Sequence, residues 1–377
     1  MVKAMEAGKL AVSELCRRLG IAEKTAYKWR NRFRLGRLRG LEDRSTRPAR
    51  VPGRTAQRWL ERLRGLRTRR PTWGVRKLRH RLGTQFGQTG LPCLSTLGRW
   101  LKRWGLVRGK RRRHCGPVIL RAMVKPARYC NDVWTVDFKG WDRTGDGTRV
   151  DPLTVRDLYS RYGLRVVILP GQSVIPARRE FVKLFHRYGL PRRIRSDNGV
   201  PFGGGGPTGL TRLSAWWIKL GIEVEFTTPG RPCENGAHEQ FHRVYKTEVA
   251  RHPAWSRAGQ QRRSNLWLKY YNEQRPHEAL AMAVPASRYR KSKRSLPTGT
   301  KPWTYPARWV RRWVKGNGEI IWRGTPRFVG ESFVGDYVGL RPKGRRVWTV
   351  YFGPVVVGEL HEEEKGNIRT AKYRHRK

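Results

Sequence analysis

The sequence predicts a multidomain α/β protein in which helical modules come first, a mixed sheet flanked by helices follows, and a small β-domain lies near the end. Three patterns lead to this prediction. Short amphipathic helices interrupted by glycine fill roughly the first hundred residues. From about Ala127 strand and helix patterns alternate, and residues 303–361 consist of short runs that alternate apolar and polar side chains.

The first module is a pair of short helices around a turn. Within residues 10–34 one apolar helix face ends at Gly20, and a second helix follows at once. A glycine between two short amphipathic helices is typical of a helix-turn-helix, whose second helix enters the major groove of DNA. Thr25, Lys28 and Arg32 would then face DNA. The alternative is an ordinary helical hairpin with a solvated basic face.

A second helical unit is predicted at residues 56–108, with Trp59 and Leu63 in one apolar stripe and Ser95 as a candidate N-cap. It fits a second helix-turn-helix or a small helical spacer equally well. A basic linker follows, and a charge run of this kind is either solvated or in contact with phosphates. Three of its residues are candidate DNA contacts: Arg111, Arg112 and Arg113.

Three carboxylates stand out in the α/β part. Asp137 lies in the predicted strand 133–138, Asp197 ends a short strand, and Glu239 lies early in the helical stretch 234–252. Cutting or joining phosphodiesters requires charge neutralisation at phosphorus and deprotonation of a water or hydroxyl. Two Mg²⁺ ions ~4 Å apart do both, and such hard cations take carboxylate oxygens as ligands.

The charge balance indicates a polyanionic partner. The chain has 82 Lys and Arg against 28 Asp and Glu, a formal net charge of +54. Such a chain binds nucleic-acid phosphates strongly and in a salt-dependent manner. Charge alone favours a binder without chemistry, of ribosomal or chromatin type, because basic patches report partners and not reactions.

Cysteine usage and hydropathy bear on location. Five cysteines without CxxC spacing fit a reducing compartment and argue against a disulfide framework or a cysteine-based zinc finger. No secretory signal and no apolar run approaching the ~20 residues of a membrane span is evident. We therefore expect a soluble, cytoplasmic protein that makes no membrane contact.

The carboxylates lie in recognisable strings, and these resemble the catalytic core of DDE recombinases. The strings are Trp134-Thr-Val-Asp137, Ser196-Asp-Asn-Gly-x-x-Phe202 and Thr228-Pro-Gly-Arg-Pro-x-Glu-Asn-Gly-x-x-Glu239. More narrowly, the chain resembles bacterial insertion-sequence transposases with a retroviral-integrase-type core. The segments Gly40–Pro48 and Tyr270-Tyr-Asn-Glu-Gln-Arg-Pro-His277 are similar to that group as well, so the resemblance covers about residues 10 to 290.

The resemblance implies an RNase H-like core, and Asp137, Asp197 and Glu239 as catalytic residues and ligands of two Mg²⁺ or Mn²⁺ ions. Asp137 would bridge both ions and the other two would each hold one. It implies a homo-oligomer, a dimer or tetramer, that pairs transposon ends and joins them to target duplex DNA through free 3′-hydroxyls. It also implies a nucleoid-associated bacterial protein, and leaves any helper ATPase unknown. The region after 300 is similar to the SH3-like barrel of integrases in its strand pattern alone.

One spacing departs from the family pattern. Such families commonly have thirty-five residues between the second Asp and the Glu, and here forty-one lie between Asp197 and Glu239. The glycine-rich stretch 203–209 accounts for the excess as a local insertion. Counting strictly makes Glu234 a rival ligand, although the motif context favours Glu239. Arg243 and Lys246 share the helix face of Glu239 and are candidate phosphate contacts.

The expected organisation runs as follows: a helix-turn-helix domain 1–40, a linker 41–55, a second helical domain 56–108, a basic linker 109–126, a catalytic core 127–290, a linker 291–302, a small β-domain 303–362 and a basic tail 363–377 that is expected to be disordered. The preferred function is a DNA transposase. Alternatives are a phage or element integrase of the same chemistry, a non-catalytic repressor derived from a transposase, and an RNase H-type ribonuclease.

Overall fold

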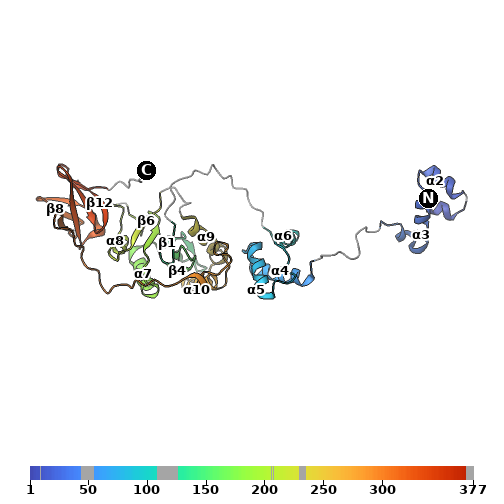
Figure 1. Ribbon diagram of the computed structural model, residues 1–377, viewed down its shortest axis with the longest axis horizontal. Helices are drawn as coiled ribbons and strands as arrows, with labels where there is room; N and C mark the ends of the chain where they lie inside the picture. The colour runs from blue at the N-terminus through green and yellow to red at the C-terminus, as the bar shows by residue number, and fades with distance from the viewer. Residues whose placement is uncertain are drawn as a thin grey trace. The chain divides into compact units, whose positions relative to one another are not determined.

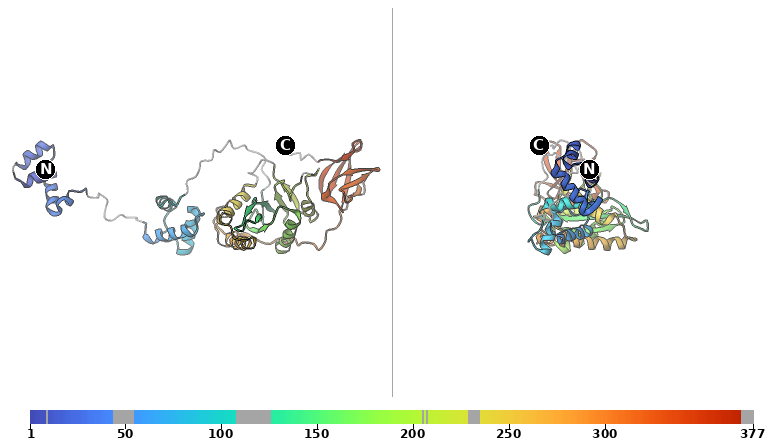
Figure 2. Two further views of the ribbon diagram at one scale, coloured as in Figure 1. Left: turned by 180° about the vertical axis from the view of Figure 1, so that it is seen from behind. Right: turned by 90° about the vertical axis from the view of Figure 1, so that its right-hand side faces the viewer.

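The computed structural model describes residues 1–8, 10–43, 55–107, 126–204, 206, 208–228 and 235–370. Two compact units make up the chain, Met1–Ala56 and Gln57–Lys377. Both are drawn in Figures 1 and 2, coloured from blue at the N-terminus to red at the C-terminus. Among the described residues no helix is long and apolar enough to cross a membrane.

The first unit confirms the predicted pair of helices around Gly20. Its helices are α1 (Val2–Glu6), α2 (Val12–Leu19) and α3 (Glu23–Gly40). Gly20 ends α2 in the left-handed region, at φ 64°, where a residue without Cβ adopts the conformation at no steric cost. Leu15 and Cys16 pack on Ala26 to form the small core between α2 and α3.

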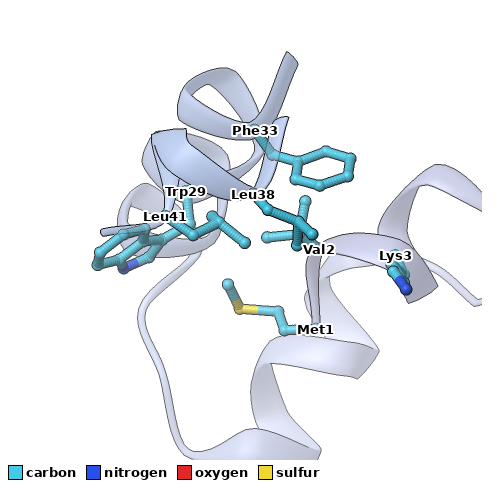
Figure 3. Close-up of a pocket in the computed structure, with 7 residues that line it drawn as sticks. All are labelled: Met1, Val2, Lys3, Trp29, Phe33, Leu38 and Leu41. Carbon is cyan, nitrogen blue, oxygen red and sulfur yellow. The ribbon is translucent and has the colours of Figure 1, made fainter. Parts of the chain in front are cut away.

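Apolar side chains of α1 and α3 also line a groove in this unit. Figure 3 shows Met1 and Val2 on one side of it and Phe33 and Leu38 on the other. Trp29 also lines this groove and is half-buried. The helix-turn-helix therefore has a thin core, and α1 supplies part of its apolar cover.

The second unit starts with three helices, α4 (Gln57–Arg69), α5 (Val75–Phe86) and α6 (Leu94–Arg103). Trp59, Leu63 and six further buried side chains form their shared core. The expected N-cap, Ser95, is wrong by two positions: α6 is capped by Cys93, whose Sγ lies 3.1 Å from the Ser95 hydroxyl. Cys93 has extended backbone angles, φ −68° and ψ 163°, so the helix begins at Leu94, one residue before Ser95.

A mixed sheet forms the centre of the unit. Its strands are β1 (Val133–Phe138), β2 (Asp142–Arg143), β3 (Arg149–Asp157), β4 (Gly163–Leu169), β5 (Arg193–Ser196) and β6 (Glu223–Phe226). β3 runs antiparallel to β1 and β4, while β1, β5 and β6 run parallel to one another. This is the predicted integrase-type mixed sheet, with β1 between β3 and β5.

Helices cover this sheet, as the predicted alternation requires. They are α7 (Val174–Tyr188), α8 (Arg212–Lys219), α9 (Gly236–Tyr245), the π-helix η2 (Lys246–Ala250), α10 (Arg257–Glu273), the 3-10 helix η3 (Glu278–Leu280) and α11 (Pro285–Arg288). Phe181 and Phe185 of α7 and Trp217 of α8 pack on Trp134 of β1 in the main core. On α9 and α10, Phe241 and Trp267 form a second cluster around Val166 of β4.

The predicted β-domain follows. Its elements are β7 (Val310–Trp313), β8 (Glu319–Trp322), β9 (Thr325–Phe328), the 3-10 helix η4 (Glu331–Phe333), β10 (Tyr337–Gly344), β11 (Val347–Phe352), β12 (Val355–His361), β13 (Gly366–Asn367) and β14 (Arg369–Thr370). Among the described residues β14-β12-β11-β10-β7 form one sheet and β13-β9-β8 another, with no closed ring of strands. The domain is therefore an open version of the small barrel expected from the strand pattern.

Two features of the β-domain depart from the expected organisation. Ile218 of α8 belongs to its apolar core, and Lys219 pairs with Asp336 at 2.6 Å, so the domain packs against the mixed-sheet core.

The expectation of a disordered tail is wrong for 366–370. Ile368 is buried and β14 pairs with β12, because a single apolar side chain at this point completes the core. Residues 371–377 lie outside the described residues.

The second helical module also contacts the core. The indole of Trp73, in the turn between α4 and α5, donates to the Tyr270 hydroxyl at 2.9 Å, and the Thr72 hydroxyl donates to the Glu248 carboxylate. Arg70 stacks over the Tyr270 ring at 4.1 Å. Tyr270 lies in the segment Tyr270–His277 whose sequence is typical of the end of such cores. That segment is therefore the docking surface for the second helical module.

Candidate active site

Asp137 and Asp197 lie on neighbouring parallel strands. The β1–β5 pairing places Thr135 beside Arg195. Asp137 stands two residues further along β1, and Asp197 directly follows the end of β5. Side chains two residues apart point to the same face of a sheet. Asp137 and Asp197 are thus brought together at the carboxyl ends of β1 and β5, as the motif spacing predicts.

The loop that carries Asp197 is shaped by the residues after it. The Asn198 side chain donates to the Thr227 carbonyl at 2.7 Å, tying the loop to the end of β6. A Cβ at Gly199 would lie 3.1 Å from the Asp197 Oδ2, tighter than an ordinary contact. Asn198 therefore holds the loop in place, and glycine at 199 leaves room for the carboxylate.

Glu239 lies in the first turn of α9 and is exposed, as are Arg243 and Lys246 further along. A side chain of the sheet holds α9 in place. Arg156 of β3, itself buried, donates to the Ala237 carbonyl in the first turn, and its guanidinium lies 5.5 Å from the centre of the Phe241 ring. This anchoring sets where Glu239 stands relative to β1.

The three carboxylates interact electrostatically. Burial first, then the negative charge of Asp197 and, less, that of Glu239 together raise the pKa of Asp137 to about 7. Partial desolvation also raises the pKa of Asp197. Among the described residues, the ligand atoms close enough together to share one metal ion belong to Asp137, His238 and His242. That Asp197 and Glu239 join Asp137 as ligands therefore stays a prediction. Glu234, the rival ligand, lies outside the described residues.

Two histidines of α9 stand behind Asp137. His238 is fully buried, and His242 is nearly so. Burial lowers the pKa of His242 to about 3, helped by the positive charges of Lys139 and Arg156, and burial likewise lowers the pKa of His238 well below its usual range. Both imidazoles are therefore neutral near pH 7. From the sequence, His238 and His242 are expected to be surface groups or to stand behind the metal ligands. The structure contradicts the surface alternative for His238, which is fully buried.

The donor set fits divalent cations. Among the described ion pairs Asp197 and Glu239 have no Lys or Arg partner, although the chain has a formal net charge of +54. Within the described part of the chain, the partner of Asp137 is the neutral His242, at 3.8 Å. Carboxylates left without cationic side chains in so basic a protein are suited to oxygen-preferring ions such as Mg²⁺ or Mn²⁺.

The candidate DNA contacts are distributed over three places. Thr25 and Lys28 are exposed on α3, whereas Arg32 is half-buried and its guanidinium stacks on Trp29 at 4.8 Å. Arg243 and Lys246 are exposed beside Glu239, with Lys246 at the point where α9 passes into the π-helix. The remaining three, Arg111, Arg112 and Arg113, lie outside the described residues.

Sequence reasoning missed three residues around Asp137. Thr135 and Thr154 bond to the buried imidazoles, and Arg156 anchors α9. One signal was available: Thr135 stands two residues before Asp137 and so shares its face, while His238 and His242 are four apart on one helix face. Thr154 and Arg156 carried no local signal, because their positions depend on strand register.

Three family models match parts of the chain. The integrase core domain model matches residues 220–285, a homeodomain-like domain model matches 25–114, and the model of the IS481 family transposase C-terminal domain matches 310–366. The first match covers α9, Glu239 and the docking surface, and the third covers most of the β-domain.

Curated relatives come from insertion elements. An uncharacterized 31.7 kDa protein of insertion element IS407 from Burkholderia multivorans is 28% identical over 184 residues, covering 48% of this chain and 64% of the relative. An uncharacterized 39.2 kDa protein of IS476 from Xanthomonas euvesicatoria is 28% identical over 252 residues, covering 66% and 70%. The chain thus spans just under two thirds of the first relative. Together with the family models, these matches confirm the resemblance to insertion-sequence transposases with an integrase-type core.

Solved integrase structures were also found. The magnesium-bound HTLV-2 integrase catalytic core aligns with 43% of this chain and 98% of that chain, at 13% identity and a TM-score of 0.34. A simian T-cell lymphotropic virus intasome in complex with the PP2A regulatory subunit B56 gamma aligns with 72% of this chain and 95% of that chain, at 14% identity and a TM-score of 0.38.

Proposed function

We propose that the chain is the DNA transposase of a bacterial insertion sequence. It binds the terminal inverted repeats of its element and hydrolyses the phosphodiester at each 3′ end. Each freed 3′-hydroxyl then attacks a phosphodiester of target DNA, joining element to target and releasing a target 3′-hydroxyl. The coarser statement, a polynucleotide-processing enzyme with an integrase-type core and DNA-binding helices, already follows from the matches above.

The observation that carries the proposal is the buried Asp137 at the end of β1, whose pKa is affected by the charges of Asp197 and Glu239. Asp137, Asp197 and Glu239 come from three separate elements, and repulsion among them raises the pKa of Asp137 to about 7, after burial. Such repulsion does not stabilise the fold, since like charges close together are unfavourable. A bound cation would neutralise this repulsion between the carboxylates.

We propose that Asp137, Asp197 and Glu239 are the carboxylate ligands of two divalent ions. Asp137 holds both ions, and Asp197 and Glu239 hold one each. Mg²⁺ or Mn²⁺, when bound, neutralises charge at the phosphate and lowers the pKa of the attacking water or 3′-hydroxyl. Arg243 and Lys246, exposed along the same helix, bind the phosphates beside the scissile bond.

The DNA-binding parts bring duplex ends to this site. Thr25 and Lys28, with Arg32 beside them, contact the major groove through α3. The linker arginines bind phosphates without regard to sequence. Two ends must be held together before joining, so we propose a homodimer or homotetramer that acts on DNA in the bacterial cytoplasm.

The decisive experiment uses the full chain with duplexes carrying the terminal repeats that flank its gene. With Mg²⁺ the wild type is expected to nick at the 3′ end and to join that end to target DNA. Asp197→Asn should lower both rates by at least ~10³-fold, yet leave DNA affinity within about twofold. Cleavage that persists in Asp197→Asn would overturn the proposal. DNA binding without any Mg²⁺-dependent cleavage by the wild type would indicate a repressor derived from a transposase.

A matched pair of variants identifies the third carboxylate. Glu239→Gln is expected to lose cleavage as completely as Asp197→Asn, because a neutral amide is a poor ligand for a hard cation. Glu234→Gln, five residues earlier, should retain most of the wild-type rate. The measurement is the single-turnover cleavage rate of both variants at one Mg²⁺ concentration. The reverse ranking would transfer the role to Glu234.

A further inference from the structure

A buried hydroxyl holds the backbone of Asp137 and both nearby imidazoles. Thr154 of β3 lies opposite Asp137 in the β1–β3 ladder, and its side chain is fully buried. Its hydroxyl donates to the Asp137 carbonyl at 3.0 Å. The same oxygen lies 2.6 Å from Nε2 of His238 and 2.7 Å from Nε2 of His242.

The hydrogen atoms of this network can be counted. A hydroxyl has one proton, and a carbonyl can only accept, so the Thr154 proton goes to Asp137. Both Nε2 atoms must then donate to the Thr154 oxygen. A neutral imidazole carries one N–H, so Nδ1 of each histidine is left as a lone pair. The network thereby fixes the tautomer of both rings.

The two lone pairs have different partners. Nδ1 of His238 accepts from the Thr135 hydroxyl at 2.7 Å, which completes the hydrogen bonds of that ring. Nδ1 of His242 has no such donor among the described residues and lies 3.8 Å from the Oδ2 of Asp137. That separation is too long for a hydrogen bond. The 3.8 Å separation is shorter than the sum of two metal–ligand bonds of ~2.1 Å each. One ion placed between the two atoms can therefore bind both.

We propose that His242 is a nitrogen ligand of an ion held by Asp137, so that the site has mixed nitrogen and oxygen donors and prefers Mn²⁺ to Mg²⁺. The inference rests on the proposed function for its assignment of Asp137 as a ligand. Imidazole suits transition metals and adds little for Mg²⁺, which prefers oxygen. Thr154 is a positioning residue, because its hydroxyl orients the His242 ring and points the lone pair at Asp137.

Pulsed electron paramagnetic resonance on the full chain loaded with Mn²⁺ tests the proposal directly. A coordinated imidazole gives a ¹⁴N modulation that oxygen ligands cannot give. The wild type is expected to show it, and His242→Gln is expected to lose it and to bind Mn²⁺ roughly tenfold more weakly or worse. Mg²⁺ affinity should change by less than about threefold. His186→Gln, at an exposed position on α7, is the matched control and should behave as the wild type.

Variants of Thr154 separate ligation from folding. Thr154→Ser keeps the hydroxyl and should retain the ¹⁴N signal. Thr154→Val removes the hydroxyl and should weaken the ¹⁴N signal. If the wild type binds Mn²⁺ without ¹⁴N modulation, and His242→Gln leaves the Mn²⁺ affinity unchanged, His242 is not a ligand, while the proposed function stands. If Asp137→Asn and Asp197→Asn bind Mn²⁺ as tightly as the wild type, the assignment beneath both proposals fails.

Discussion

Asp137→Asn is expected to abolish cleavage and strand transfer while making the metal-free protein more stable at pH 8. The loss of activity should be at least ~10³-fold, because this carboxylate is proposed to hold both ions. The gain in stability follows from its raised pKa of about 7, which burial and the charge of Asp197 cause. The negative charge of an ionised Asp137 therefore destabilises the folded state. Asparagine removes that charge.

The sign of the pH dependence follows from proton binding. Below about pH 4 Asp137 is protonated in both the folded and the unfolded chain. Between about pH 4 and 7 the folded state binds more protons, so the free energy of unfolding falls as pH rises. It levels off above about pH 7, after a loss on the order of 4 kcal/mol. Asp137→Asn should lack this decline.

Urea unfolding in the presence of a chelator, at pH 5 and pH 8, measures the effect. The advantage of Asp137→Asn should be present at pH 8 and small at pH 5. Asp197→Asn is an informative control: without that neighbouring charge the decline for Asp137 should move to lower pH and shrink. Addition of Mn²⁺ at pH 8 should stabilise the wild type and not Asp137→Asn. Parallel pH dependence in wild type and variant would contradict the argument.

The catalytic positions were predictable because their signals are local. Asp137 lies in a strand marked by the apolar run 133–138, and Asp197 and Glu239 lie in strings typical of a known group. Each string also specifies its own loop, as Asn198 and Gly199 show around Asp197. Local sequence was therefore sufficient to propose which carboxylates form the site, although not what surrounds them.

The surroundings depend on long-range pairing that no local pattern records. Thr154 reaches Asp137 only through the antiparallel register of β1 and β3. Apolar periodicity indicates that Trp73 is buried, but not that its indole meets Tyr270, 197 residues later. The same holds for Ile368, which is one apolar residue in a basic stretch and is buried only because β12 lies ready to pair.

The contact between the second helical module and the core leads to the other large expected effect. Glu248 of the π-helix accepts from three groups: Arg275 Nη1 at 2.5 Å, Trp267 Nε1 at 2.7 Å and the Thr72 hydroxyl. The Arg275 side chain is only 4% exposed. One carboxylate therefore joins the module, α10 and the segment Tyr270–His277.

Glu248→Ala should lower the free energy of unfolding by about 3–5 kcal/mol, because it leaves a buried guanidinium without its partner. Glu248→Gln keeps an acceptor oxygen and should cost less. Tyr270→Phe, which removes one hydrogen bond to Trp73, should cost about 1 kcal/mol. Denaturant unfolding of the three variants at pH 7 gives the ranking. If Glu248→Ala lowers the free energy of unfolding no more than Tyr270→Phe does, the Glu248–Arg275 ion pair contributes as little as an exposed ion pair. The predicted ranking would show that the Glu248 carboxylate anchors the second helical module to the core.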